Sequence, residues 1–119
     1  MMNYKDLVVW QRAMELTAEA YRLAKKLPKE ETYALADQIR RSAVSIPSNI
    51  AEGQSRNSDK EFKRFLNIAR GSKAELETQL LIGVNVGYFS DSDISRALCL
   101  IDEIGKMLTK LISKLAVSG

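Results

Sequence analysis

The residues best suited to chemistry in this sequence are the basic side chains between positions 38 and 73. This stretch holds eight lysines and arginines against three acidic residues, so it carries +5 of a chain whose net charge is +3. A local excess of this kind attracts polyanions, because lysine and arginine replace the counterions of phosphate groups. The candidate phosphate contacts are Arg40, Arg41, Arg56, Lys60, Lys63, Arg64 and Arg70. A solvated helical face explains the same residues equally well at this point.

Five polar residues in the middle of the chain recur three or four positions apart, which places them on one face of a helix. They are Lys60, Lys63, Arg64, Asn67 and Arg70. The arginines of the preceding loop and helix can extend this stripe. Few aromatic residues lie among them, so the pattern favours contact with a sugar–phosphate backbone over recognition of bases. The alternative is a structural network in which the arginines pair with the glutamates at positions 52 and 75.

Catalytic and metal chemistry finds little support in the composition. The chain has no histidine, which removes the commonest general base and metal ligand, and Cys99 is its single cysteine. Metal sites in helical bundles need glutamates and histidines that project together into the core. Glu75 and Glu77 are two residues apart and point in different directions. We therefore expect no enzyme, no metal, no cofactor and no small-molecule substrate.

Apolar residues repeat every three or four positions in four successive segments, which predicts four helices. The expected ranges are 6–27, 29–53, 58–88 and 90–115, with Asp6 capping the first and a Ser58–Glu61 capping box opening the third. Lysines at 106, 110 and 114 complement the dipole at the C-terminal end of the fourth. We predict an all-α fold, a single domain over residues 1–119, built as an antiparallel up-down-up-down four-helix bundle. Residues 116–119 are expected to fray.

The first predicted helix carries two adjacent apolar stripes where a helix packed on one neighbour needs only one. One stripe contains Trp10, Met14 and Tyr21, and the other contains Ala13 and Leu16. Two stripes suggest burial against a second surface as well, such as another subunit.

Pro47 interrupts the second predicted helix without breaking its apolar spacing. Proline removes a backbone donor, so the carbonyl of Ala43 loses its usual partner. We predict that the helix continues with a kink at Pro47, eased by Ser45 and Ser48, and ends with Gly53 just beyond it. The alternative is a break, with Ser45 capping a new short helix. Gly71, in the third helix, either allows close approach of another backbone or is merely tolerated.

The chain shows no run of 18 or more apolar residues, and its N-terminal residues lack the apolar core of a signal peptide. We expect no membrane partner and a cytoplasmic location.

Three stretches together resemble a known family. They are YKDLVVWQRAMEL (residues 4–16), QIRRSAVSIPSNIAEG (38–53) and EFKRFLNIARGSKAELETQLLIG (61–83). They are similar to the four-helix-bundle family of 23S rRNA intervening-sequence proteins, encoded in insertions within bacterial 23S rRNA genes and elsewhere. The accessory protein of diversity-generating retroelements resembles the chain more distantly.

The resemblance implies a homopentameric ring of bundles with a basic surface that binds nucleic acid, and no catalytic residues. The positions that match the family motif are Gln38, Arg40, Arg41, Ser45, Pro47, Asn49, Glu52, Gly53, Arg70, Gly71, Ser72 and Glu75. The chain departs from the family pattern at Ala34, where glycine is frequent, and in the loop at residues 53–56, which lacks the usual aromatic residue.

Two functional hypotheses follow. The first is a non-enzymatic oligomer that binds RNA or DNA through its basic residues. The second is a scaffold or protein-interaction ring whose charges serve subunit contacts or a protein partner. In that case Arg40→Ala and Arg41→Ala break the oligomer rather than nucleic-acid affinity.

Overall fold

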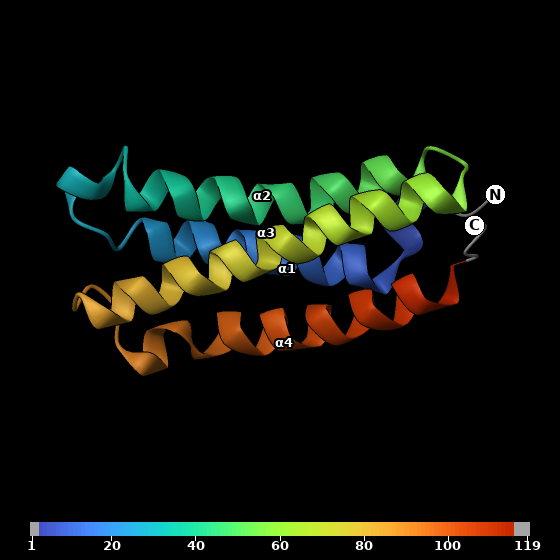
Figure 1. Ribbon diagram of the computed structural model, residues 1–119. Helices are drawn as coiled ribbons and strands as arrows, with labels where there is room; N and C mark the ends of the chain where they lie inside the picture. The colour runs from blue at the N-terminus through green and yellow to red at the C-terminus, as the bar shows by residue number, and fades with distance from the viewer. Residues whose placement is uncertain (1–2, 116–119) are drawn as a thin grey trace.

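The computed structural model describes residues 3–115, and this range contains helices and no strand. The long helices are α1 (Val8–Ala24), α2 (Leu35–Gln54), α3 (Asp59–Asn85) and α4 (Asp91–Lys114). Two 3-10 helices, η1 (Tyr4–Asp6) and η2 (Lys29–Glu31), precede α1 and α2. Figure 1 shows the long helices side by side, each running opposite to the one before it, in a bundle 46 Å long. The prediction of an all-helical fold with four long helices is confirmed. The fraying expected for residues 116–119 lies outside the described residues.

One apolar stripe from each long helix builds a shared core. The largest fully buried side chains are Leu16, Leu23, Ile39, Ile46, Ile50, Leu66, Leu76, Leu80, Ile94, Ile101, Ile104 and Leu108. Each such side chain contributes about 1.5–3 kcal/mol on leaving water, which drives the helices together. On α1 the stripe with Ala13 and Leu16 is buried, whereas Met14 and Tyr21 of the other stripe are 46% and 41% exposed. No described helix is long and apolar enough to span a bilayer.

The predicted starts of the first two helices are wrong, because short 3-10 turns take up the residues before them. Asp6 does not cap α1; it ends η1, whose cap is the Asn3 side chain accepting from the Lys5 amide at 2.9 Å. α2 begins at Leu35 instead of position 29, and Glu31 Oε1 accepts from the Leu35 amide at 3.2 Å. A carboxylate from the preceding turn thus satisfies one of the free amides at the start of α2.

The reciprocal capping box lies at the start of α4 and not at the start of α3. Ser58 Oγ accepts from the Glu61 amide at 3.3 Å, but the Glu61 carboxylate binds Arg64 instead of returning to Ser58. At α4, Ser90 Oγ accepts from the Asp93 amide at 3.1 Å, and Asp93 Oδ2 accepts from the Ser90 amide at 2.8 Å. The bond from the Ser90 backbone holds the pKa of Asp93 below its ordinary value.

α2 runs without interruption from Leu35 to Gln54, with Pro47 inside it, so the alternative of a break capped by Ser45 is wrong. The carbonyl of Ala43, which the proline leaves without its helical donor, lies 3.2 Å from Thr17 Oγ1 of α1, and the single proton of this hydroxyl is shared with the carbonyl of Ala13 at 2.8 Å. The missing donor is therefore replaced in part by a shared hydroxyl on a neighbouring helix and not by the serines that flank the proline. The kink at Pro47 stays a prediction.

The glycine that allows close approach is Gly53 and not Gly71. Gly53 lies inside α2, so its predicted place beyond the helix end is wrong. A β-carbon at Gly53 would come within 2.6 Å of the Phe65 Cβ atom of α3, whereas a β-carbon at Gly71 would meet nothing within 4 Å. The absent side chain at Gly53 thus lets α2 and α3 cross closely near their shared loop.

Candidate nucleic-acid interface

Arg40 and Arg41 share one carboxylate on α2. Arg41 Nε donates to Asp37 Oδ2 at 2.8 Å, and Arg40 lies 3.9 Å from the other oxygen of the same carboxylate. Arg40 also donates to the carbonyl of Thr32 at 3.0 Å, which anchors its side chain to the turn before α2. Two guanidinium groups and one carboxylate leave a net charge of +1 at this position. The positive charge predicted here is therefore reduced by half.

Arg56 and Arg64 enclose Phe65 near the α2–α3 loop. Their guanidinium carbons lie 5.1 and 4.5 Å from the ring centroid. Arg56 pairs with Glu52 at 2.6 Å and Arg64 with Glu61 at 3.3 Å, so both positive charges are matched. The hydrogen bond from Arg64 also holds the pKa of Glu61 below its ordinary value. This group stabilises the end of the bundle, and because its ion pairs are partly exposed, solvent weakens them.

The remaining predicted contacts lie on α3. Lys60 is exposed and Lys63 is half-buried. Arg70 is exposed, and its guanidinium donates to the neutral Oδ1 of Asn67 at 3.1 Å. Asn67 in turn donates to the carbonyl of Lys63 at 3.0 Å. The positive charge of Arg70 is therefore not paired with a carboxylate within residues 3–115, in contrast with the arginines described above.

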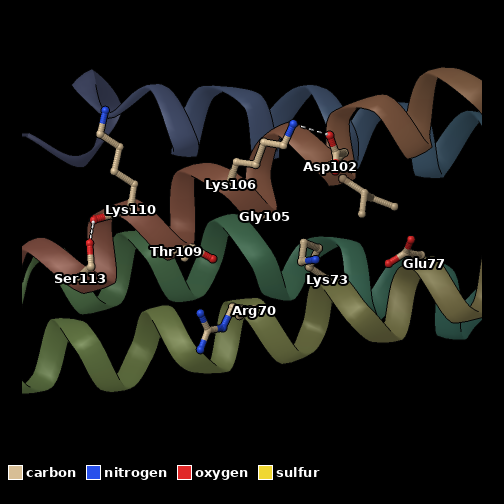
Figure 2. A pocket seen from close by; sticks show the side chains of 10 residues that line it. Arg70, Lys73, Glu77, Asp102, Gly105, Lys106, Thr109, Lys110 and Ser113 are labelled. Carbon is tan, nitrogen blue, oxygen red and sulfur yellow. Dashed lines mark hydrogen bonds and ion pairs between the residues drawn. The ribbon is translucent and has the colours of Figure 1, made fainter.

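A groove between α3 and α4, with a volume of about 520 Å³, brings Arg70 together with three lysines absent from the predicted set. Figure 2 shows Lys73 beside Gly105 in the middle of this groove, with Lys106 and Lys110 on α4. We call this surface the α3–α4 groove. Its lining residues are Arg70, Lys73, Glu77, Ile101, Asp102, Gly105, Lys106, Thr109, Lys110 and Ser113. The lining contains four cations, two carboxylates and no aromatic side chain.

The spacing of Lys106 and Lys110 in the sequence indicates that both lie on one side of α4, where they can line this groove. Lys106 and Lys110 are four residues apart, which puts them on one face of α4, and they were interpreted only as complements of the helix dipole. In Figure 1 α4 runs antiparallel to α3. Pairing the two segments in opposite directions would have placed these lysines opposite Arg70 and Lys73.

Most of the family-motif residues lie between α2 and α3. Ser45 Oγ and Ser72 Oγ are hydrogen-bonded at 2.7 Å, and Asn49 Nδ2 donates to Ser45 Oγ at 2.9 Å. One helical turn away, Ser42 Oγ donates to Gln79 Oε1 at 2.7 Å. These bonds join α2 to α3 through side chains that are partly or fully removed from water. The motif residues here serve the contact between two helices.

A second groove of about 470 Å³ follows this line of contacts, and we call it the α2–α3 seam. Its lining residues are Gln38, Arg41, Ser42, Ser45, Ser72, Glu75 and Gln79. Pro47 and Gly53 are buried on α2, Glu52 is exposed, and Gly71 is exposed on α3. Of the predicted phosphate contacts, only Arg41 lines the α2–α3 seam and only Arg70 lines the α3–α4 groove.

Metal ligands do not gather in the described part of the chain. Within residues 3–115 no group of three or more acidic or cysteine side chains is placed to hold a metal ion. Two groups with shifted pKa values lie in contacts that explain the shifts. The pKa of Tyr88 is raised because its hydroxyl donates to Glu31 at 2.9 Å, and the pKa of Glu19 is lowered by its hydrogen bond from Arg22. Neither group lines the α3–α4 groove.

Comparison with known proteins gives one matching family model and four matching chains among solved structures. The model of the family described as 23S rRNA-intervening sequence protein matches residues 5–110. A crystal structure from Bacteroides thetaiotaomicron, described as a protein with unknown function from the S23 ribosomal protein family, superimposes with a TM-score of 0.82 at 28% identity. The match covers 89% of this chain and 99% of that one. No curated protein matched the sequence.

Proposed function

The chain belongs to the family of 23S rRNA-intervening sequence proteins, and on that premise we propose that it is a non-enzymatic helical bundle that self-associates and binds the phosphate backbone of RNA or DNA. The proposed location is the cytoplasm, where an exposed thiol such as that of Cys99 stays reduced.

The observation that carries the nucleic-acid part of this proposal is the α3–α4 groove. Arg70 and three lysines from two helices line it together with Glu77 and Asp102, so the lining carries a net positive charge. Phosphate contacts made by lysine and arginine supply most of the affinity in binding that does not depend on sequence. The absence of aromatic side chains from the lining favours contact with the backbone over stacking with bases.

The binding test is a titration of labelled structured RNA and duplex DNA, followed by fluorescence anisotropy at several salt concentrations. If several phosphates are neutralised, the logarithm of affinity falls linearly with the logarithm of salt, by about 0.9 for each contact. Absence of binding at low salt, or binding that salt does not weaken, would contradict the proposal.

The self-association part is supported by apolar side chains that the single bundle leaves exposed. Met14 and Tyr21 on α1 and Ile68 and Ile82 on α3 are each at least 40% exposed. A second subunit would bury them, and the family resemblance proposes a pentameric ring. Native mass spectrometry and light scattering of the purified protein measure the subunit number directly, and a monomer at micromolar concentration would contradict this part.

An interaction ring with no nucleic-acid ligand is the second candidate. It is favoured by the shared Asp37 partner of Arg40 and Arg41, because residues already paired on one chain can serve a subunit contact. In this case the Arg40→Ala, Arg41→Ala variant dissociates in light scattering. If the first candidate is correct, the variant remains assembled and its nucleic-acid affinity changes little.

A further inference from the structure

The side chain of Lys73 lies across Gly105 where α3 meets α4. A β-carbon at Gly105 would come within 3.1 Å of Lys73 Nζ and 3.4 Å of Lys73 Cε. Both residues are half-buried, and Ile101 and Leu108 on the same helix belong to the core. Glycine inside a helix costs about 1 kcal/mol relative to alanine. At this position its missing side chain leaves room for the lysine to lie against α4.

The ammonium group of Lys73 is not matched by a carboxylate at ion-pair distance within residues 3–115. Arg70, less than one turn earlier, is bonded to a neutral amide oxygen. Lys106 pairs with Asp102 at 3.2 Å, but their side chains are 80% and 70% exposed, so solvent screens that pair strongly. Lys73 is half-buried and Arg70 is exposed, and their two unmatched positive charges repel one another. A bound anion relieves this repulsion.

We propose that Arg70, Lys73 and Thr109, together with the gap at Gly105, form a phosphate-binding site in the α3–α4 groove. Lys73 supplies a compact charge at the centre, and Arg70 supplies a planar set of donors that matches phosphate oxygens. The hydroxyl of Thr109 lines the same groove and adds a donor from α4. The groove, at about 520 Å³, has ample room for a phosphate group.

The source of the phosphate is the backbone of RNA or DNA, so this inference rests on the proposed function. Its contribution is to assign the central contact to Lys73, which the sequence did not single out. It also gives Gly105 a role in binding that is independent of charge.

Two variants test the site by different physical routes. Lys73→Gln removes the charge. Gly105→Ala keeps every charge, but its new methyl group displaces the flexible end of Lys73 while raising the helix propensity of α4. The matched controls are Gly71→Ala, a helical glycine with open space around it, and Lys29→Gln, an exposed lysine in η2.

Each variant is titrated with inorganic phosphate, followed by amide chemical shifts in NMR, and with labelled duplex DNA and RNA at several salt concentrations. In the unmodified protein, phosphate should shift amides around residues 70–73 and 105–110. Lys73→Gln should weaken nucleic-acid binding about tenfold and reduce the salt slope by about 1. Gly105→Ala should also weaken binding while its thermal unfolding midpoint stays the same or rises. Both controls should bind like the unmodified protein.

If Lys73→Gln and Gly105→Ala bind nucleic acid with unchanged affinity and salt slope, the site is wrong while the proposed function stands. If the unmodified protein binds no nucleic acid but phosphate still shifts the groove amides in a Lys73-dependent way, the proposed function fails and the site takes free phosphate. If phosphate shifts no groove amide, the site itself is overturned.

Discussion

The α2–α3 seam and the α3–α4 groove lie on either side of α3, and their polar groups are used in opposite ways. In the seam, Ser45, Ser72 and Asn49 are bonded to one another, and Arg41 is bonded to Asp37. In the groove, Arg70 and Lys73 have no carboxylate partner at ion-pair distance within the described residues. The polar groups of the seam therefore hydrogen-bond to one another and hold two helices together. The donors of the groove remain available for a bound ligand.

This difference teaches that a count of charges along a sequence does not give the field at the surface. The stretch with the largest excess of basic residues contains two acid–base pairs, Arg56 with Glu52 and Arg64 with Glu61, and Asp37 just before it pairs with Arg41. Each pair lowers the local net charge. The lysines of α4 lie in another part of the sequence, yet they join Arg70 in one groove.

The largest expected effect comes from filling the space at the α2–α3 crossing. Gly53→Ala places a β-carbon 2.6 Å from the Phe65 Cβ atom, so it should lower the free energy of unfolding by about 2 kcal/mol. Gly71→Ala is the matched control, because its β-carbon meets nothing and its helix propensity rises by up to about 1 kcal/mol. Urea unfolding of both variants measures these changes. Equal effects of the two substitutions would show that the crossing is not close.

The next effect concerns the carbonyl left free by Pro47. Thr17→Val removes the hydroxyl that the carbonyls of Ala43 and Ala13 share, and we expect the free energy of unfolding to fall by about 1–2 kcal/mol. In a Pro47→Ala background the residue at position 47 regains its own amide, so the same substitution should cost less. A double-mutant cycle by urea unfolding isolates this coupling. Additive effects would indicate that the Thr17 bond to Ala43 contributes nothing to stability.

A smaller effect is expected from releasing the arginines that are neutralised on α2 and α3. Asp37→Asn, Glu52→Gln and Glu61→Gln together remove the partners of Arg41, Arg56 and Arg64. The salt slope of nucleic-acid binding should then steepen by up to about 0.9 for each arginine that reaches a phosphate. Anisotropy titrations at several salt concentrations measure the slope. An unchanged slope would confine binding to the α3–α4 groove.

The dependence of stability on pH tests the ion pair between Glu61 and Arg64. Its pKa is lowered by Arg64, so its contribution to stability is present above the ordinary value of 4.5 and is lost as pH falls through the lowered folded value. Glu61→Gln should lose this part of the acid dependence, as measured by urea midpoints from neutral to acidic pH. A profile that Glu61→Gln leaves unchanged below pH 4.5 would contradict the pairing.

The smallest effect on stability is expected in the α3–α4 groove. Arg70→Gln and Lys110→Gln remove charges that repel their neighbours and hold no carboxylate, so unfolding free energy should change by less than about 0.5 kcal/mol. Any change at low salt should be stabilising. A clear loss of stability in urea unfolding would mean that these cations support the fold, and the contrast with the α2–α3 seam would disappear.

The number and order of the helices could be predicted from the sequence, because burial of one stripe per helix imposes a period near 3.6. The first residues of α1 and α2 could not be predicted in this way. They depend on the 3-10 turns that precede the helices and on the hydrogen bond from the Leu35 amide to Glu31, and apolar spacing does not reveal either feature. For Gly71 the sequence left close approach and mere tolerance open, and the structure supports tolerance, whereas the close approach occurs at Gly53. Which glycine faces another helix depends on the crossing of α2 and α3, and spacing within one helix does not contain that information.

Only part of the candidate site could be predicted, because spacing within one helix does not show which residues face another helix. Periodicity assigned Arg64 and Arg70 to one stripe. In the structure Arg64 pairs with the carboxylate of Glu61, whereas Arg70 donates to the neutral amide oxygen of Asn67. Lys73 and Lys110 needed knowledge of which residues face each other across two antiparallel helices.

The hydrogen bond from Thr17 to the carbonyl of Ala43 has a consequence for how the bundle reaches one arrangement. Most backbone carbonyls in a helix are satisfied locally and are indifferent to which neighbour lies alongside. Pro47 makes one carbonyl of α2 an exception, because its helical donor is missing and the hydroxyl of Thr17 on α1 shares its proton between this carbonyl and that of Ala13. Sliding α1 by one turn, about 5.4 Å, would bury that carbonyl without a partner. Pro47 therefore favours one alignment of α1 and α2 along their axes, because a shifted alignment leaves the Ala43 carbonyl without this contact.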